Sequence, residues 1–70
     1  MPSPMEILVN GAPREVPEGT TMAQLIEMLG LTGRRLAVEV NREIVPRSTF
    51  ETHRVQPGDR IEIVHAIGGG

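Results

Sequence analysis

The chain has 70 residues, a formal net charge of −2 at pH 7, and no cysteine, tryptophan or tyrosine. This length allows one domain with a small core, and the missing cysteines exclude both a disulfide framework and thiolate chemistry. All the positive charges are arginines and Phe50 is the single aromatic residue, so the basic excess and stacking side chains that nucleic acid requires are missing. These totals favour a carrier or adaptor over an enzyme.

Three further observations bound the class of protein. The apolar runs are far too short to cross a bilayer, and Met1 to Pro4 (MPSP) lacks the regions of a signal peptide. The two histidines, His53 and His65, lie far apart without cysteine partners, so no metal site is expected. We therefore expect a cytoplasmic protein that is monomeric when free and binds neither nucleic acid nor a membrane.

The first strands are predicted as a hairpin. In MEILVN (5–10), Met5 and every second residue after it share one face, as in a strand. Asn10-Gly11 is a strong signal for a tight hairpin turn, because both residues tolerate positive φ. The segment APREV (12–16) then returns as a second strand and directs Val16 toward the core.

The next segment changes from strand to helical periodicity. After the loop PEGT, apolar residues recur at helical spacing over 21–29. Thr21 and Gln24 fit a capping box, in which each side chain accepts a hydrogen bond from the backbone of the other. Gly30 suits the left-handed position just past the helix end. The residues expected to face the sheet are Met22, Leu25, Ile26 and Leu29.

The second half of the chain returns to strands. LAVEV (36–40) alternates, 41–43 reads as a tight turn, and IVP (44–46) is a short strand ended by its proline. The irregular segment 47–55 is expected to cover the open end of the core with Phe50 and Val55.

The last strand is predicted for RIEIVHAI (60–67), after a turn signal at Pro57-Gly58-Asp59. Alternation directs Ile61 and Ile63 inward and Val64 to the outer face.

This order of elements predicts an α+β fold of the β-grasp class, the fold of ubiquitin. One helix would cover one face of a mixed four- to five-stranded sheet, and the crossover through the helix would combine parallel and antiparallel pairs. The expected organisation is a disordered leader at 1–4, the β-grasp domain at 5–67, and a flexible C-terminal glycine tail at 68–70.

The sequence ends in HAIGGG (65–70), which has a plain explanation as a frayed end. A functional explanation rests on what glycines permit, because an arm without side chains can thread a narrow tunnel. At ~3.3 Å per residue, residues 66–70 would reach about 16 Å from the sheet. The reactive group that this arm delivers is the Gly70 α-carboxylate, which is ionised at neutral pH. It needs activation, most simply as an acyl-adenylate formed from ATP.

Four segments together resemble the sulfur carrier family of thiamine biosynthesis. The resemblance covers Met5 to Gly70, and Gly68 stands where the family also has alanine, while the final Gly69-Gly70 pair is intact. The segments that carry it are MEILVNG (5–11), LAVEVNREIVPR (36–47), PGDRIEIV (57–64) and VHAIGGG (64–70).

The resemblance implies a mechanism centred on Gly70. An adenylating enzyme related to the ubiquitin-activating enzymes would use ATP to convert the Gly70 carboxylate to an acyl-adenylate. Sulfur from a donor such as a cysteine desulfurase would replace AMP and give a thiocarboxylate, which thiazole synthase would use. The chain itself would bind no cofactor and act as no enzyme. The residues expected to thread into the partner's active site are Ile67, Gly68, Gly69 and Gly70.

Strand alternation also predicts a partner-binding surface on the sheet face opposite the helix. Leu8, Ala37 and Val64 fall on this face, and Ala66 continues it toward the tail. An exposed apolar patch on a small domain is typical of a protein interface. The alternative is that loops cover these residues. His65 is interpreted as a strand-end residue with no catalytic role.

Other functions stay open at this point. The small subunit of molybdopterin synthase is also a β-grasp sulfur carrier, although the segment VNREIVPR (40–47) favours the thiamine family. A ubiquitin-like modifier that forms protein conjugates is a second alternative. A regulatory or RNA-binding β-grasp module shares the PEGTT-helix pattern, but the acidic balance and the missing lysines argue against RNA.

Overall fold

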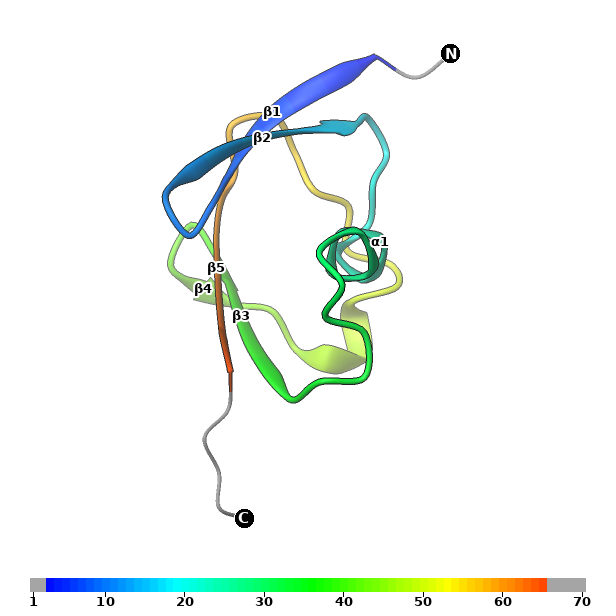
Figure 1. The fold of residues 1–70 in the computed structure, drawn as a ribbon, viewed down its shortest axis with the longest axis vertical. Coiled ribbons are helices and arrows are strands. Elements are labelled where there is room, and N and C mark those ends of the chain that lie inside the picture. The colour runs from blue at the N-terminus through cyan, green and yellow to red at the C-terminus, as the bar shows by residue number, and fades with distance from the viewer. Residues whose placement is uncertain (1–2, 66–70) are drawn as a thin grey trace.

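The computed structural model describes residues 3–65. Figure 1 shows these residues as a curved sheet with an α-helix packed against its concave side. The remaining residues of the predicted last strand, Ala66 and Ile67, and the predicted tail at 68–70 lie outside the described part. In chain order the elements are β1 (Pro4–Val9), β2 (Ala12–Pro17), α1 (Met22–Met28), β3 (Leu36–Val40), β4 (Glu43–Ile44), the 3₁₀ helix η1 (Arg47–Thr49) and β5 (Arg60–His65).

The sheet has five strands in the order β2-β1-β5-β3-β4. The last strand therefore lies at the centre, where β5 pairs in parallel with β1 and antiparallel with β3. The β1–β2 and β3–β4 pairs are antiparallel hairpins on either side of it. This arrangement confirms the predicted α+β class and the β-grasp fold with a mixed sheet on one helix.

The first hairpin forms as its turn residues predict. Val9 and Ala12 are the last cross-strand pair, and between them Asn10 and Gly11 have φ values of 51° and 84°. These left-handed values match the right-handed twist of the flanking strands.

The start of β1 corrects the predicted leader at residues 1–4. The strand begins at Pro4, opposite Pro17, one residue before the expected domain start. The Ser3 carbonyl accepts a hydrogen bond of 2.8 Å from the Glu18 backbone N–H. The prolines do not prevent this pairing, because they stand at strand ends, where a missing N–H is tolerated. The leader is therefore structured at Ser3 and Pro4, while residues 1 and 2 lie outside the described part.

The helix begins at the predicted capping box. The Gln24 backbone N–H donates to Thr21 Oγ1 at 3.2 Å, and the Thr21 backbone N–H donates to Gln24 Oε1 at 2.9 Å. The helix ends one residue earlier than expected, at Met28, since Leu29 is its C-cap. Gly30 follows with a φ of 72°, which confirms its predicted role past the helix end.

The hairpin between β3 and β4 turns without a glycine. Asn41 and Arg42 have φ values of 52° and 72°. Residues other than glycine and asparagine rarely adopt such positive values. The Asn41 side chain compensates, because its Nδ2 donates to Asp59 Oδ1 at 3.1 Å and its Oδ1 accepts from the Arg60 backbone N–H at 3.0 Å. The turn, predicted at 41–43, consists of Asn41 and Arg42, because Glu43 already pairs with Val40. The short strand predicted at 44–46 is accordingly 43–44. Asn41 joins this turn to the start of β5.

The core lies between α1 and the inner face of the sheet. Every strand except β4 contributes buried apolar side chains, as alternation predicts, and Val55 seals one end of the core. Phe50 is partly buried and packs against the cluster, as expected for the irregular segment. The buried core residues are Met5, Ile7, Val16, Met22, Leu25, Ile26, Val38, Val40, Val45, Val55, Ile61 and Ile63.

The Asn10 side chain extends the pairing of β1 with β5 beyond the end of β1. Its Oδ1 accepts from the Ile63 backbone N–H at 2.8 Å, and its Nδ2 donates to the Ile63 carbonyl at 3.2 Å. The amide therefore occupies the place on β5 that the next peptide group of β1 would take if the chain did not turn.

We expect Asn10→Gly to lower the free energy of unfolding by about 1–3 kcal/mol, because two partly buried hydrogen bonds are lost while positive φ is still tolerated. Asn10→Ala should cost more, because alanine adds the strain of a left-handed conformation. Urea unfolding measured by circular dichroism tests both variants. Wild-type stability in Asn10→Gly would show that the side chain does not anchor β5.

Candidate functional site

The predicted reactive segment follows directly on the central strand of the sheet. Ile61 and Ile63 of β5 are buried in the core, and the strand remains paired with β3 up to the Leu36–His65 pair. Figure 1 shows this end of β5 leaving the domain on the side away from the β1–β2 hairpin. The strand therefore gives residues 66–70 a firmly held starting point.

The residues predicted to react or to thread into a partner lie outside the described part of the chain. They are Ala66, Ile67, Gly68, Gly69 and Gly70. Their roles remain predictions, and the structure contributes only the position of His65, from which they continue.

The outer face of the sheet carries the other predicted site residues. Ala37 and Val64 are cross-strand partners on this face; both are exposed, and Val64 keeps 57% of its surface accessible. Leu8 is on the same face but is half-buried rather than exposed. Its cross-strand partners are Pro13 and Arg60. Since Val64 is four positions beyond Arg60 on β5, Leu8 lies apart from the Ala37–Val64 pair, at a distance of roughly 13 Å along the strand.

Ile44 is an exposed apolar residue that the sequence analysis did not select. It is 76% exposed and pairs with Glu39, which points outward between the buried Val38 and Val40. The register after the two-residue turn was the signal that could have assigned Ile44 to the outer face. We call Ala37, Ile44 and Val64 the outer patch.

Two glutamates border the outer patch. Glu39 and Glu62 stand directly opposite each other on β3 and β5. A second pair on the same face of the sheet, Glu6 and Glu15 on β1 and β2, lies away from the patch, beyond Leu8. Like charges in directly opposed positions destabilise a sheet. Their presence on a face that also exposes apolar side chains fits a surface that binds a partner with basic groups.

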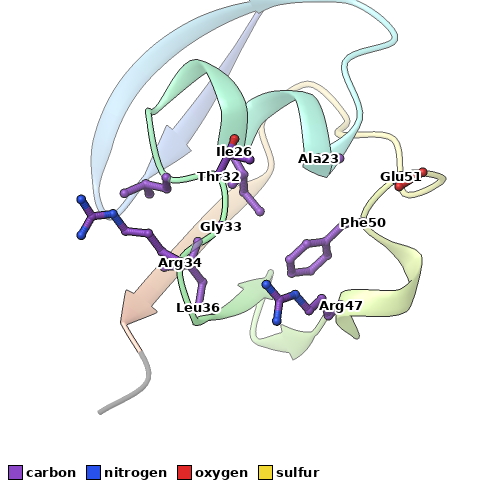
Figure 2. Close-up of a pocket in the computed structure, with 10 residues that line it drawn as sticks. Ala23, Ile26, Thr32, Gly33, Arg34, Leu36, Arg47, Phe50 and Glu51 are labelled. Atoms are coloured by element: carbon purple, nitrogen blue, oxygen red, sulfur yellow. The ribbon is translucent and has the colours of Figure 1, made fainter. Parts of the chain in front are cut away.

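A hollow opens on the other side of the sheet, between α1, the loop after it and η1. Figure 2 shows Ile26 and Thr32 on its helix side, and Phe50 with Arg47 on its η1 side. Its volume is about 280 Å³. No histidine lines it, and it offers no recognisable nucleophile–base pair.

Residues 3–65 contain no group of three or more histidine, cysteine, aspartate or glutamate side chains arranged to hold a metal ion. No helix in this part of the chain is long and apolar enough to span a bilayer. His53 is half-buried and its carbonyl accepts from the Met22 N–H at 2.8 Å, so its contact with the helix is structural.

Comparison with known proteins decides between the candidate families. The model of the ThiS family matches residues 7–70. The chain belongs to the ThiS family. It is 36% identical over 66 residues to the sulfur carrier protein ThiS of Escherichia coli strain K12, an alignment that covers 94% of this chain and 100% of that protein. The resemblance to this family described above is confirmed.

Solved structures of ThiS give the same assignment. The crystal structure of the thiamine biosynthesis protein ThiS from Geobacter metallireducens superposes with a TM-score of 0.82 at 32% identity. The superposition covers 94% of this chain and 100% of that one. At this identity and coverage the comparison supports both the fold and the family.

Thiazole synthases also contain a segment similar to this ThiS-family chain. The thiazole synthase of Paramagnetospirillum magneticum and that of Magnetococcus marinus are each 42% identical to it over 66 residues. These 66 residues are 94% of this chain but only 20% of either relative. The chain therefore spans about a fifth of the length of these two relatives.

We expect Glu62→Gln to raise the Tm of the ThiS-family domain by a few degrees, because it removes the repulsion from Glu39 across the strand pair. The gain should shrink in high salt, which screens exposed charges. Glu51→Gln, in the turn after η1, removes the same charge outside the sheet and is the matched control. A thermal unfolding scan with equal Tm for Glu62→Gln and the parent would contradict this view of the acidic pair.

Proposed function

We propose that this chain carries sulfur for thiazole formation in thiamine biosynthesis, as a thiocarboxylate at Gly70. The observation that carries the proposal is the family match, which runs through Gly70 itself. The alignment with the E. coli sulfur carrier protein over that protein's full length supports the same function. In this proposal the reacting group is the α-carboxylate of Gly70.

The first step activates the carboxylate. A carboxylate oxygen of Gly70 attacks the α-phosphorus of ATP in an adenylating enzyme, pyrophosphate leaves, and an acyl-adenylate forms. Glycine suits this position because it has no side chain to hinder approach to the carbonyl carbon.

The second step replaces oxygen by sulfur. A thiol reductant releases hydrosulfide from the persulfide of a donor such as a cysteine desulfurase and is itself oxidised to a disulfide. The hydrosulfide attacks the carbonyl carbon, the bond to AMP breaks, and AMP leaves with the electron pair. The product is a thiocarboxylate, and no oxidation or reduction occurs at the carbon. This sulfur is more nucleophilic than the original carboxylate oxygen, which suits its transfer to an acceptor.

The fold supplies recognition, because the proposed reactive atoms belong to the main chain. A tail of glycines offers few side-chain contacts, so a partner enzyme must identify the chain through its folded part. The outer patch and its bordering glutamates lie on β3, β4 and β5, the last of which continues into the tail. We propose this face as the docking surface for the enzymes that act on Gly70.

The proposed partners follow from the same chemistry. Thiazole synthase is supported as a partner by the relatives of that name that contain a segment similar to this chain. The adenylating enzyme and the sulfur donor are required by the two steps at Gly70. In this scheme ATP is consumed by the adenylating enzyme and this chain holds no cofactor. We propose that these reactions take place in the cytoplasm.

The sulfur-loading proposal is tested by intact mass spectrometry. Incubation with the adenylating enzyme of the same organism, ATP and a sulfide source should raise the mass by one sulfur less one oxygen. Deletion of Gly69 and Gly70 should abolish the gain and leave the Tm unchanged, because the described core lies within residues 3–65. An unmodified parent in a mixture that loads the E. coli protein would contradict the proposal.

The docking surface is tested with Ile44→Ser and Val64→Ser. Each should weaken binding to thiazole synthase by about tenfold or more if the outer patch contributes to the centre of the interface. The Tm should change little, because both side chains are largely exposed. Met28→Ser, at an exposed apolar position on α1, is the matched control. If all three variants bound thiazole synthase with the affinity of the parent in a calorimetric titration, this face would be excluded as the docking surface.

A further inference from the structure

The hollow between α1 and η1 lies on the opposite side of the sheet from the outer patch. Its walls come from two segments that are distant in the sequence, the loop 31–34 after α1 and the segment 47–51 around η1. Figure 2 shows Arg47 and Phe50 projecting from the η1 side toward Leu36 at the start of β3. Three parts of the fold therefore meet at this hollow.

Backbone hydrogen bonds hold both walls of the hollow in place. In the loop after α1, the Leu31 N–H donates to the Ile26 carbonyl at 3.0 Å, and the Arg34 N–H donates to the Leu31 carbonyl at 3.1 Å. On the other side, the Phe50 carbonyl accepts from the Ala23 N–H at 2.9 Å. Because the walls are fixed to α1, the hollow is formed before a ligand arrives, which lowers the entropic cost of binding.

The interior of the hollow is largely apolar. Leu31, Leu36 and Phe50 line it, and each of them is partly buried and packs against the core. Ile26 of α1 is a further apolar lining residue, and Phe50 is the one aromatic residue of the sequence. An apolar ligand in this space would remove the remaining accessible surface of these side chains from water, which is favourable.

Positive charge predominates at the rim. Arg34 and Arg47 line the hollow from its two walls, and both are exposed. Glu51 is the one acidic residue among the described residues that line it, and Figure 2 shows the Arg47 guanidinium and the Glu51 carboxylate on opposite sides of Phe50. Two positive charges and one negative charge give the lining a net charge of +1, which matches a monoanion. A carboxylate fits best, because its two oxygens accept hydrogen bonds from the fork of a guanidinium.

The volume of the hollow limits the size of the ligand. A dry cavity of about 150 Å³ holds a benzene molecule, and the hollow has a volume of about 280 Å³. It therefore has room for a benzene-sized group together with a short chain that ends in a charged group.

We propose that this hollow binds a small carboxylate with an aromatic or branched apolar body. The apolar body lies among Ile26, Leu36 and Phe50, and the carboxylate accepts hydrogen bonds from Arg47, while Arg34 adds attraction from the other wall. The site is separate from the sulfur chemistry proposed at Gly70, because it lies on the helix side of the sheet and uses side chains. A bound ligand would connect α1, β3 and η1 and thereby stabilise the folded state.

The proposal is tested with two ligands of the same shape and different charge. 3-Phenylpropionate carries a carboxylate that is ionised at neutral pH, whereas 3-phenylpropionamide has a neutral amide in its place. In an NMR titration of the ¹⁵N-labelled chain, the carboxylate should shift the backbone signals of Thr32, Gly33, Leu36 and Glu51, with a dissociation constant on the order of 1 mM. The amide should bind at least tenfold more weakly. Equal binding of the two ligands, or shifts confined to other segments, would overturn the proposal.

Arg47→Gln tests which charge holds the carboxylate. Because this side chain is exposed, the Tm without ligand should stay near the parental value. We expect the affinity for 3-phenylpropionate to fall by about tenfold, since a charge-assisted hydrogen bond is lost. Arg14→Gln removes the same charge at an exposed position on β2, away from the hollow, and is the matched control. If both variants bound 3-phenylpropionate as tightly as the parent, the assignment of Arg47 and with it the proposed site would be wrong.

Discussion

The structure depends on the placement of the last strand between the first and the third. β5 joins two local hairpins that would otherwise share no backbone hydrogen bonds within residues 3–65, and it does so through a short parallel pairing with β1. Isolated two-stranded hairpins are marginally stable in water. The side-chain amides of Asn10 and Asn41 reinforce this junction from opposite sides, one at Ile63 and the other at Arg60 and Asp59. The same strand that completes the core therefore positions the proposed reactive end.

The two asparagines have similar backbone conformations and similar tasks. Each occupies a hairpin turn at positive φ, and each uses its amide to bond the main chain of β5. A left-handed residue with a side chain costs free energy relative to glycine in the same position. Here the cost is offset by hydrogen bonds that no glycine could make. This explains why both turns present asparagine to the centre of the sheet.

Most of the fold could be predicted because its signals are local. The Asn10-Gly11 turn, the Thr21–Gln24 capping box and the alternation around Ile61 and Ile63 each specify a structure within a few residues. The contacts that escaped prediction are long-range. The strand order depends on pairings between distant segments. The hydrogen bond from the Asn10 amide to the Ile63 carbonyl joins residues 53 positions apart. No local sequence pattern indicates such a pairing.

The candidate site was predicted unevenly for the same reason. The Gly70 chemistry was inferred from residue types and a family resemblance, and the family is confirmed, whereas the tail itself lies outside the described residues. On the folded part, alternation along a strand correctly assigned Ala37 and Val64 to the outer face. Ile44 was missed because its face depends on the register of a two-residue strand.

The central position of β5 also links folding to the completeness of synthesis. A ribosome makes β5 last among the described elements, so a nascent chain that stops before residue 60 holds two separate hairpins and lacks Ile61 and Ile63 from its core. Non-local pairings of this kind form only after the distant segment is available. A folded domain is consequently one whose translation has passed His65, and enzymes that recognise the assembled sheet would ignore prematurely terminated chains. The topology would thus restrict the proposed modification at Gly70 to chains whose sheet is complete.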